Sequence, residues 1–241
     1  MRSDLYQQMY TTERTYWWYR VRREIVHDLL NRYYGSRTDL SILDIGCGTG
    51  ALMKELESRG TVAGTDYSES ALEFCRSRGI TNVKQADIVA LPYADNSFDV
   101  AILFDVLEHI KDDAAALREI KRILKPGGRV LIAVPAFMFL WGANDIDVHH
   151  FRRYTLPRLK QEINGSGMKA ERMSYYNFFL FIPIATVLVL MRIFGLNAGP
   201  GQEIHGTIPN KILYAIFHAE SVLLRHMNYP FGISILAVAQ K

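Results

Sequence analysis

Cysteine is scarce in this chain of 241 residues, which contains only Cys47 and Cys75. Neither residue belongs to a Cys-x-x-Cys pair or to a cluster with metal-ligand spacing. We therefore expect no disulfide framework and no bound metal. Two free thiols favour a reducing, cytoplasmic compartment.

An excess of charge of one sign is also lacking. The formal net charge is +3, and lysine and arginine form no long run. This balance is too weakly basic to indicate a nucleic-acid partner. The first twenty residues contain no apolar stretch of signal-peptide length, so secretion is not expected.

What the chain does contain is an alternation of short apolar runs with helical patterns between residues 41 and 134. The expected strands are 41–45, 61–65, 83–86, 98–104 and 129–134. The expected helices are 50–59, 68–78 and 112–124, and a turn is expected at 126–128. Strands that alternate with helices of this length predict βαβ units and a doubly wound, mostly parallel α/β sheet.

The remaining segments predict three parts of the molecule. Residues 1–40 are expected to form a helical cap. A Rossmann-like domain is expected from residues 41–175 and 229–241, with a long loop at 135–155, a helix at 156–163 and strands at 169–175 and 232–240. Residues 176–228 form an apolar helical insertion before the last strand.

A glycine loop, ILDIGCGTG, follows the first expected strand at residues 42–50. Glycine lets the backbone turn tightly and approach a ligand that a Cβ would exclude. The spacing of Gly46, Gly48 and Gly50 is GxGxG, whereas a pyrophosphate-binding turn normally has GxGxxG. Asp44 is placed to orient the loop or to accept from a ligand ammonium. An ordinary glycine-rich turn is the alternative.

Two aspartates end the next strands of the predicted sheet. Asp66 follows Gly46 by about twenty residues, where a doubly wound fold places the carboxylate that binds ribose hydroxyls. Asp87 follows the third strand and is placed to accept from an adenine amino group, with Ile88 against the ring. An ordinary turn aspartate is the alternative for Asp87. Together with the loop, these residues converge on one adenosine-sized ligand.

With these segments in place, the chain resembles class I S-adenosylmethionine-dependent methyltransferases of the type 11 group. The matching segments are LDIGCGTG (43–50), GTDYS (64–68), 86–110 and 117–135. The resemblance implies a seven-stranded sheet with a reversed last strand, and S-adenosylmethionine as cofactor. The cofactor-binding residues it implies are Asp44, Gly46, Cys47, Gly48, Gly50, Asp66, Tyr67, Asp87, Ile88, Phe104 and Asp105.

Candidate catalytic residues are three histidines. His109 follows the fourth strand, and neutral imidazole suits a general base near neutral pH. His149 and His150 lie in the expected loop after the fifth strand. Adjacent residues of an extended segment point apart, so these two do not form a zinc site. A structural histidine is the alternative for His109.

Candidate acceptor-binding residues come from two segments. Arg152, Arg153 and Tyr154 follow the histidine pair, and two arginines suit a phosphate or carboxylate. The alternative there is a loop held by salt bridges to Asp145 and Asp147. In the aromatic segment near the N-terminus, the candidates for a lid are Tyr16, Trp17 and Arg20. The alternative there is a helix that packs its aromatic face on the core.

These residues predict an enzyme that transfers a methyl group to a small-molecule or lipid-linked acceptor, with oxygen as the first choice of acceptor atom. An NAD-dependent oxidoreductase and a non-catalytic binding protein remain as rivals. The segment after the fourth strand reads FDVL rather than the N/DPPY type of amino-methylating enzymes. Nucleic acid is therefore not expected as a partner.

The apolar insertion contains an uncharged stretch, FFLFIPIATVLVLM, at residues 178–191. Its fourteen residues are fewer than the roughly 17 to 25 that a spanning helix needs. We expect a helix pair that contacts a membrane surface above the acceptor pocket. A homodimer interface or simple cap packing is the alternative for residues 176–228.

Overall fold

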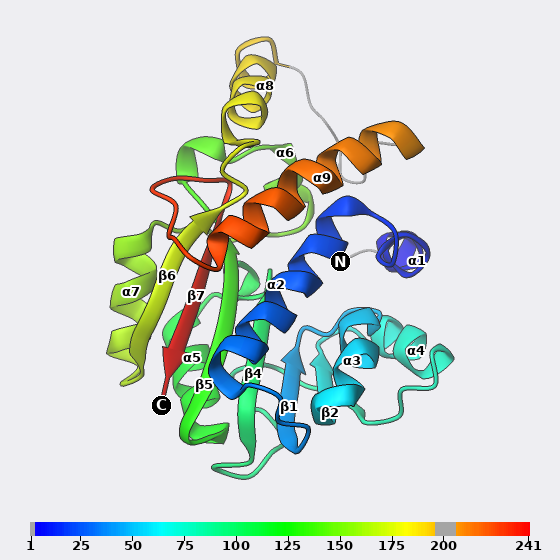
Figure 1. The fold of residues 1–241 in the computed structure, drawn as a ribbon, viewed down its shortest axis with the longest axis vertical. Helices are drawn as coiled ribbons and strands as arrows, with labels where there is room; N and C mark the ends of the chain where they lie inside the picture. The colour runs from blue at the N-terminus through cyan, green and yellow to red at the C-terminus, as the bar shows by residue number, and fades with distance from the viewer. Residues whose placement is uncertain (1–2, 196–205) are drawn as a thin grey trace.

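The computed structural model describes residues 3–195 and 206–241. Its centre is a seven-stranded sheet with strand order β3-β2-β1-β4-β5-β7-β6 (Figure 1). The strands are β1 (Leu40–Ile45), β2 (Gly60–Asp66), β3 (Val83–Gln85), β4 (Phe98–Phe104), β5 (Leu124–Pro135), β6 (Lys169–Tyr176) and β7 (Ser234–Gln240). Pairing is parallel from β3 through β5, and β7 runs antiparallel to both of its neighbours. The predicted doubly wound, mostly parallel sheet with a reversed last strand is confirmed.

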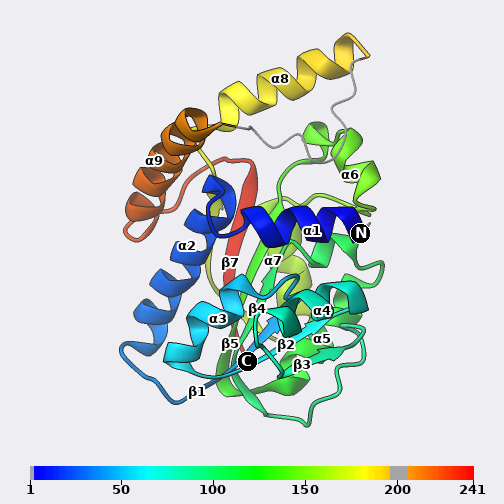
Figure 2. The same cartoon turned by 90° about the vertical axis from the view of Figure 1, so that its right-hand side faces the viewer.

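Helices cover both faces of this sheet (Figures 1 and 2). The longer ones are α1 (Ser3–Thr12), α2 (Trp17–Tyr34), α4 (Glu69–Ser77), α5 (Asp113–Ile123), α7 (Leu156–Gly165), α8 (Phe181–Ile193) and α9 (Thr207–Leu224). Shorter turns are α3 (Ala51–Leu56), η1 (Glu57–Arg59), η2 (Leu107–His109), η3 (Met138–Leu140) and α6 (Ala143–Asp147). Helices α2 and α9 pack together on one face, and α5 and α7 pack together on the other.

Two local predictions are wrong. The expected turn at 126–128 lies inside β5, which pairs with β4 from Leu124 onward across an irregularity in register. The expected loop at 135–155 contains η3 and α6. In both places pairing or packing with distant segments supplies hydrogen bonds that local glycine and proline content does not reveal.

The strands are apolar because both faces of the sheet are covered. In β1 and β4, Leu43, Ile42, Val100 and Ile102 have no exposed surface. Such continuous apolar runs are typical of parallel strands between two helical layers. Strand order reverses between β1 and β4, and ligands bind at the carboxyl ends of strands at such a point. The site is therefore expected at the edge formed by the loops after β1, β2 and β4.

The apolar insertion folds into α8 and α9, with residues 196–205 outside the described part of the chain. Helix α9 lies alongside α2, whereas α8 projects beyond the carboxyl edge of the sheet (Figures 1 and 2). Within residues 3–195 and 206–241, no helix combines the length and the apolar character needed to cross a membrane.

A buried carboxylate in α9 fixes the segment that leads into α8. Glu220 is 1% exposed, and its Oε2 accepts hydrogen bonds from the backbone N–H groups of Phe178 (2.7 Å) and Phe179 (3.1 Å). A buried backbone N–H without an acceptor is destabilising. Glu220 therefore joins the end of β6 to α9 and sets where α8 begins.

We expect Glu220→Ala to lower the free energy of unfolding by about 2 kcal/mol, because two part-buried backbone donors lose their acceptor. Glu220→Gln keeps one side-chain carbonyl oxygen and should lose less than half of that amount. Urea unfolding of the three proteins measures both changes. Equal stability of Glu220→Ala and the unmodified chain would contradict this role.

Candidate functional site

The glycine loop between β1 and α3 is closely packed on both sides. Gly46, Gly48 and Gly50 all have positive φ angles, which side chains disfavour. A Cβ on Gly46 would lie 2.3 Å from Val106 Cγ2, and one on Gly48 would lie 3.0 Å from Met9 Cε. Glycine is therefore required here for tight packing against Val106, which follows β4, and against α1, as well as for the turn.

Asp66 ties the end of β2 to this loop. Its carboxylate accepts from the backbone N–H of Gly48 (3.1 Å) and from that of Ser68 (2.9 Å). Burial raises the pKa of Asp66 above its usual value. Two backbone donors leave further lone pairs of the carboxylate for a ligand, because an ionised carboxylate has about four acceptor positions.

Asp44 is the buried acid beneath the loop. It is 5% exposed, and no hydrogen bond to its side chain is found within the described residues. Burial, followed by the charges of Asp66 and Glu13, raises the pKa of Asp44 to about 8. An uncompensated buried carboxylate beside the loop suits a cationic partner such as an ammonium group.

The remaining predicted cofactor residues lie around the same edge of the sheet. Asp87 is exposed, and its Oδ1 accepts from the Val89 N–H at 3.2 Å, as in an aspartate turn. Ile88 is buried beside it, whereas Tyr67 is 77% exposed. Cys47 is buried, with its Sγ 4.0 Å from Cys75 Sγ. The two cysteines are free thiols.

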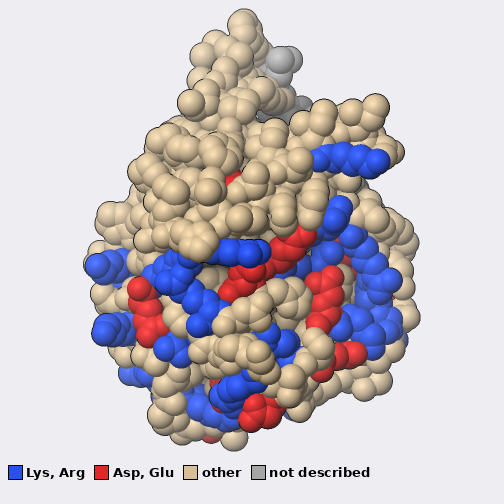
Figure 3. Space-filling view, in the orientation of Figure 1, with Lys and Arg blue, Asp and Glu red and all other residues tan. Residues whose placement is uncertain are grey.

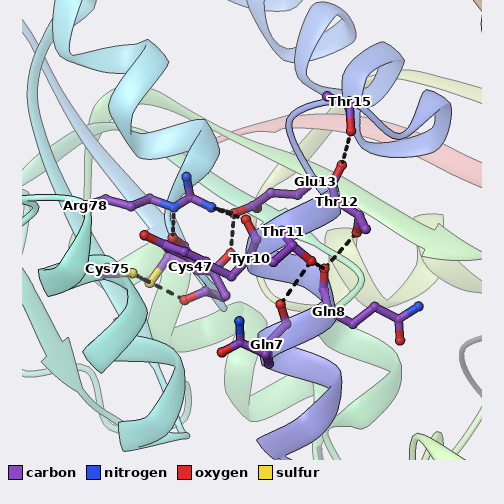
Figure 4. Close-up of polar contacts among 12 residues, drawn as sticks. Gln7, Gln8, Tyr10, Thr11, Thr12, Glu13, Thr15, Cys47, Cys75 and Arg78 are labelled. Atoms are coloured by element: carbon purple, nitrogen blue, oxygen red, sulfur yellow. Dashed lines mark hydrogen bonds and ion pairs between the residues drawn. The ribbon is translucent and has the colours of Figure 1, made fainter.

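Helix α1 lies over the loop and is held there by a buried ion pair that the sequence analysis missed. The Arg78 guanidinium contacts Glu13 at 2.5 Å, and both side chains are 5% exposed (Figure 4). Thr49 donates to the same carboxylate. Tyr6 lies beside Asp66, and burial together with that charge raises the pKa of Tyr6 to about 12. The N-terminal helix is thus part of the site.

A second ion pair, also missed, joins a buried arginine of α2 to the residue that follows β4. Arg22 is 7% exposed and pairs with Asp105, which has a positive φ angle of 56°. The guanidinium carbon of Arg22 lies 5.2 Å from the ring centre of Phe104 and 5.3 Å from that of Trp18. A sequence signal existed, because Arg22 occupies the same helical stripe as the buried Ile25 and its neighbours.

Two of the three predicted catalytic histidines come together. The ring centres of His109 and His150 lie 4.6 Å apart, whereas His149 is exposed on a residue with positive φ. Burial, and next the neighbouring His150, lower the pKa of His109 to about 4. Glu108 is buried between them and α2, and burial followed by the Asp105 charge raises its pKa. The imidazole groups of His109 and His150 and the carboxyl group of Glu108 therefore cluster beside the end of β4.

The Arg-Arg-Tyr segment has mainly structural partners. Arg153 forms a two-pronged ion pair with Asp145, and Arg152 pairs with Asp113 at 2.6 Å. Tyr154 is fully buried and donates to Asp113 at 2.8 Å. The structure therefore gives Arg153 the salt-bridge alternative with Asp145 and corrects the expectation that Tyr154 faces an acceptor.

The aromatic segment likewise packs against α9. Trp17 is 6% exposed, its backbone N–H donates to Asn210 at 2.8 Å, and its ring lies edge-on to Phe217. Arg20 stacks over Tyr214, with 3.8 Å from its guanidinium carbon to the ring centre. Tyr16 packs partly buried against the core. Trp17 and Arg20 thus contact α9 from α2, as in the alternative of a helix that packs its aromatic face on the core.

A cavity of about 360 Å³ lies away from this edge, between α2, α9 and the sheet. Its lining includes Leu29, Arg172 and Leu224 and contains none of the predicted cofactor residues. A lining of packed helix side chains is consistent with a gap between layers. The chemistry of the carboxyl edge is therefore the better guide to the site.

Comparison with known proteins agrees with this geometry. Residues 43–132 match the family model described as a methyltransferase domain. A demethylmenaquinone methyltransferase from Staphylococcus aureus is 38% identical over 118 residues, which cover 46% of this chain and 47% of that protein. The chain thus spans about half the length of the curated relatives it matches. Residues 43–132 are thus similar to the methyltransferase-domain family.

Solved structures extend the similarity of fold to almost the whole chain. An S-adenosylmethionine-dependent methyltransferase from Thermotoga maritima has a TM-score of 0.61 at 19% identity. The superposition covers 99% of this chain and 95% of the Thermotoga chain. One from Mesorhizobium loti has a TM-score of 0.60 at 18% identity, with coverages of 90% and 98%. At these identities the likeness establishes the fold.

The raised pKa of Asp44 predicts a specific pH dependence of stability. An aspartate with a folded-state pKa near 8 stays protonated while the unfolded chain ionises near 3.8. Its contribution to stability is therefore full below about pH 4 and is lost as the pH rises toward 8.

Asp44→Asn removes this dependence. Without added ligand, the free energy of unfolding of the variant relative to the unmodified chain should increase by more than about 1 kcal/mol between roughly pH 5 and pH 8, since one pKa unit corresponds to about 1.4 kcal/mol. Urea unfolding across pH measures this, with Asp87→Asn as an exposed control. A pH-independent difference for Asp44→Asn would argue against a buried, raised Asp44.

Proposed function

We propose that the chain is an S-adenosylmethionine-dependent methyltransferase that acts on a small-molecule or lipid-linked acceptor. The observation that carries the proposal is the joining of Asp66 to the glycine loop through the Gly48 N–H, beside the unpartnered acid Asp44. At the carboxyl edge of this sheet, the two carboxyl groups can accept hydrogen bonds from ribose hydroxyls and from an ammonium group. The match of residues 43–132 to the family model supports it.

The residues present fit this cofactor, which supplies an electrophilic methyl group on a sulfonium. Asp66 would bind the ribose hydroxyls, Asp44 would face the ammonium, and Asp87 with Ile88 would flank the adenine. The ion pair of Arg22 with Asp105 fixes the end of β4, where the acceptor would be aligned with the methyl group. We expect the acceptor's nucleophilic atom to lie beside the cluster of His109 and His150, where its proton would be lost.

The acceptor is proposed to carry its nucleophile on oxygen and to be associated with a lipid. The support is the name of the curated relatives, whose substrate demethylmenaquinone is a lipid-linked quinone. The residues that would contact an acceptor lie outside the matched segment 43–132. The substrate of this chain is therefore proposed from the apolar surroundings of the site rather than from the match alone.

Those surroundings present an exposed apolar helix. Ile182, Val187 and Ile193 on α8 are 68%, 54% and 69% exposed. Figure 3 shows that the protruding end of the molecule carries almost no charged side chains on the face in view, whereas the lower half is densely charged. An apolar helix of this kind beside a lipid-handling site suits insertion into a membrane surface. We propose a bilayer as the partner of α8.

Asp66 provides the test of the cofactor assignment. Asp66→Ala should weaken binding of S-adenosylhomocysteine at least about tenfold by titration calorimetry, because charge-assisted hydrogen bonds to the ribose are lost. Glu69→Ala, an exposed acid one turn along, is the control and should bind normally. Circular dichroism checks the fold of each protein. If the chain binds NADH tightly but does not bind S-adenosylhomocysteine, an oxidoreductase is favoured and the proposal is refuted.

Flotation with lipid vesicles tests the membrane contact. We expect the unmodified chain to float with phosphatidylcholine–phosphatidylglycerol vesicles at low salt. The double variant Ile182→Asp/Val187→Asp should float several-fold less, because two exposed apolar side chains that would enter the lipid become charged. Val89→Asp, at an exposed apolar residue after β3, is the control. A chain that stays with the lipid-free fraction, or that forms a dimer through α8 instead, would refute the membrane contact.

A further inference from the structure

Three potential metal ligands converge beside the end of β4. Glu108, His109 and His150 each offer one ligand atom, and these atoms lie within 4.8 Å of one another. Glu108 Oε1 and His150 Nε2 lie 3.8 Å apart. Ligands about 2.1 Å from a tetrahedral ion lie roughly 3.4 Å apart, so small side-chain rotations complete the geometry. The cofactor assignment uses none of the three.

Glu108 is the residue that points to a ligand. It is 1% exposed, and within the described part of the chain neither carboxylate oxygen has a hydrogen-bond partner. A buried carboxylate without partners is costly unless it meets a cation. The nearby acid Asp145, by contrast, has its oxygens bonded to Arg153, His150 and the Gly142 N–H. Glu108 is therefore an acceptor for which the neighbouring protein groups supply no donor.

His150 is oriented in the way that metal-ligating histidines are. Its Nδ1 lies 2.8 Å from Asp145 Oδ1, so that Nδ1 carries the proton and Nε2 presents its lone pair toward Glu108. A carboxylate that holds the second ring nitrogen fixes the tautomer and raises the basicity of the ligand. Arg153 in turn fixes Asp145 through two hydrogen bonds of 2.8 and 2.9 Å. The arginine that sequence reasoning assigned to an acceptor thus supports this cluster.

We propose that Glu108, His109 and His150 bind a divalent transition-metal ion of the zinc class. Two imidazoles and one carboxylate with an open fourth position are the ligand set of catalytic zinc sites. Nitrogen donors disfavour magnesium and calcium, which prefer oxygen ligands. The expectation of no metal rested on His149 and His150 pointing apart, whereas the partners of His150 come from a different loop.

The open position suggests a role for the ion, and this part rests on the proposed methyltransferase function. Glu108 follows Asp105 by one turn, so the ion lies close to the end of β4 where the acceptor is proposed to bind. An acceptor hydroxyl in the open position would lose its proton to solvent more readily, because a metal ion lowers the pKa of a bound oxygen. The ion, rather than His109 as a base, would then prepare the oxygen for attack on the methyl carbon. As the new C–O bond forms, the C–S bond breaks and its electron pair stays on sulfur.

Metal binding is tested without cofactor or acceptor. Protein stripped with a chelator is titrated with ZnCl₂ by calorimetry, and with CoCl₂ while visible absorption is recorded. We expect one ion per chain and a visible cobalt band. Glu108→Gln and His150→Asn should each weaken zinc binding at least about tenfold, since each removes a direct ligand. His149→Asn is the matched control at the adjacent, exposed histidine, and asparagine tolerates its positive φ angle.

The outcomes separate this proposal from the proposed function. Absence of saturable zinc binding in the unmodified chain, or equal binding by Glu108→Gln, would overturn the metal site. If His150→Asn fails to fold by circular dichroism, Glu108→Gln alone decides. Zinc binding with no affinity for S-adenosylhomocysteine would support the metal site and contradict the methyltransferase function. Binding of S-adenosylhomocysteine without zinc binding would contradict the metal site and support the methyltransferase function.

Discussion

The ion pair of Arg22 with Asp105 is the contact on which the arrangement of the site depends. It joins α2, which lies outside the central sheet, to the residue that ends β4 in a left-handed conformation. A buried guanidinium without its carboxylate would be strongly destabilising, so the two elements are fixed to each other. Asp105 then sets the direction of the chain into η2, where Glu108 and His109 lie.

Much of the fold could be predicted because the signals are local. The strand at 98–104 and the βα alternation up to residue 134 follow from apolar runs bounded by turn residues. The glycine loop after the first strand and the position of Asp66 at the end of the second strand also predicted that Asp66 lies beside the loop. The turn expected at 126–128 was wrong because β5 already begins at Leu124, which pairs with Phe98 of β4, and the strand passes through 126–128 as an irregularity in register.

The contacts that complete the site depend on residues far apart in the sequence. Glu13 meets Arg78, and His109 meets His150, only after the sheet has brought their loops to one edge. Sequence reasoning compared His150 with its neighbour His149, and so found no shared ligand geometry. A polar residue inside an apolar helical stripe, as at Arg22, was the one available signal of such a contact.

The position of α1 has a consequence for the rate of turnover. Met9 packs against Gly48, and the buried pair of Glu13 with Arg78 holds the helix down over the loop. A nucleoside ligand that binds on that loop would lie against α1, so its entry and release would require α1 to move. Opening therefore requires separating a desolvated ion pair, which is slow compared with side-chain motion. For a bound nucleoside, such an opening would be a step separate from bond making, and α1 together with Glu13 would set how fast it occurs.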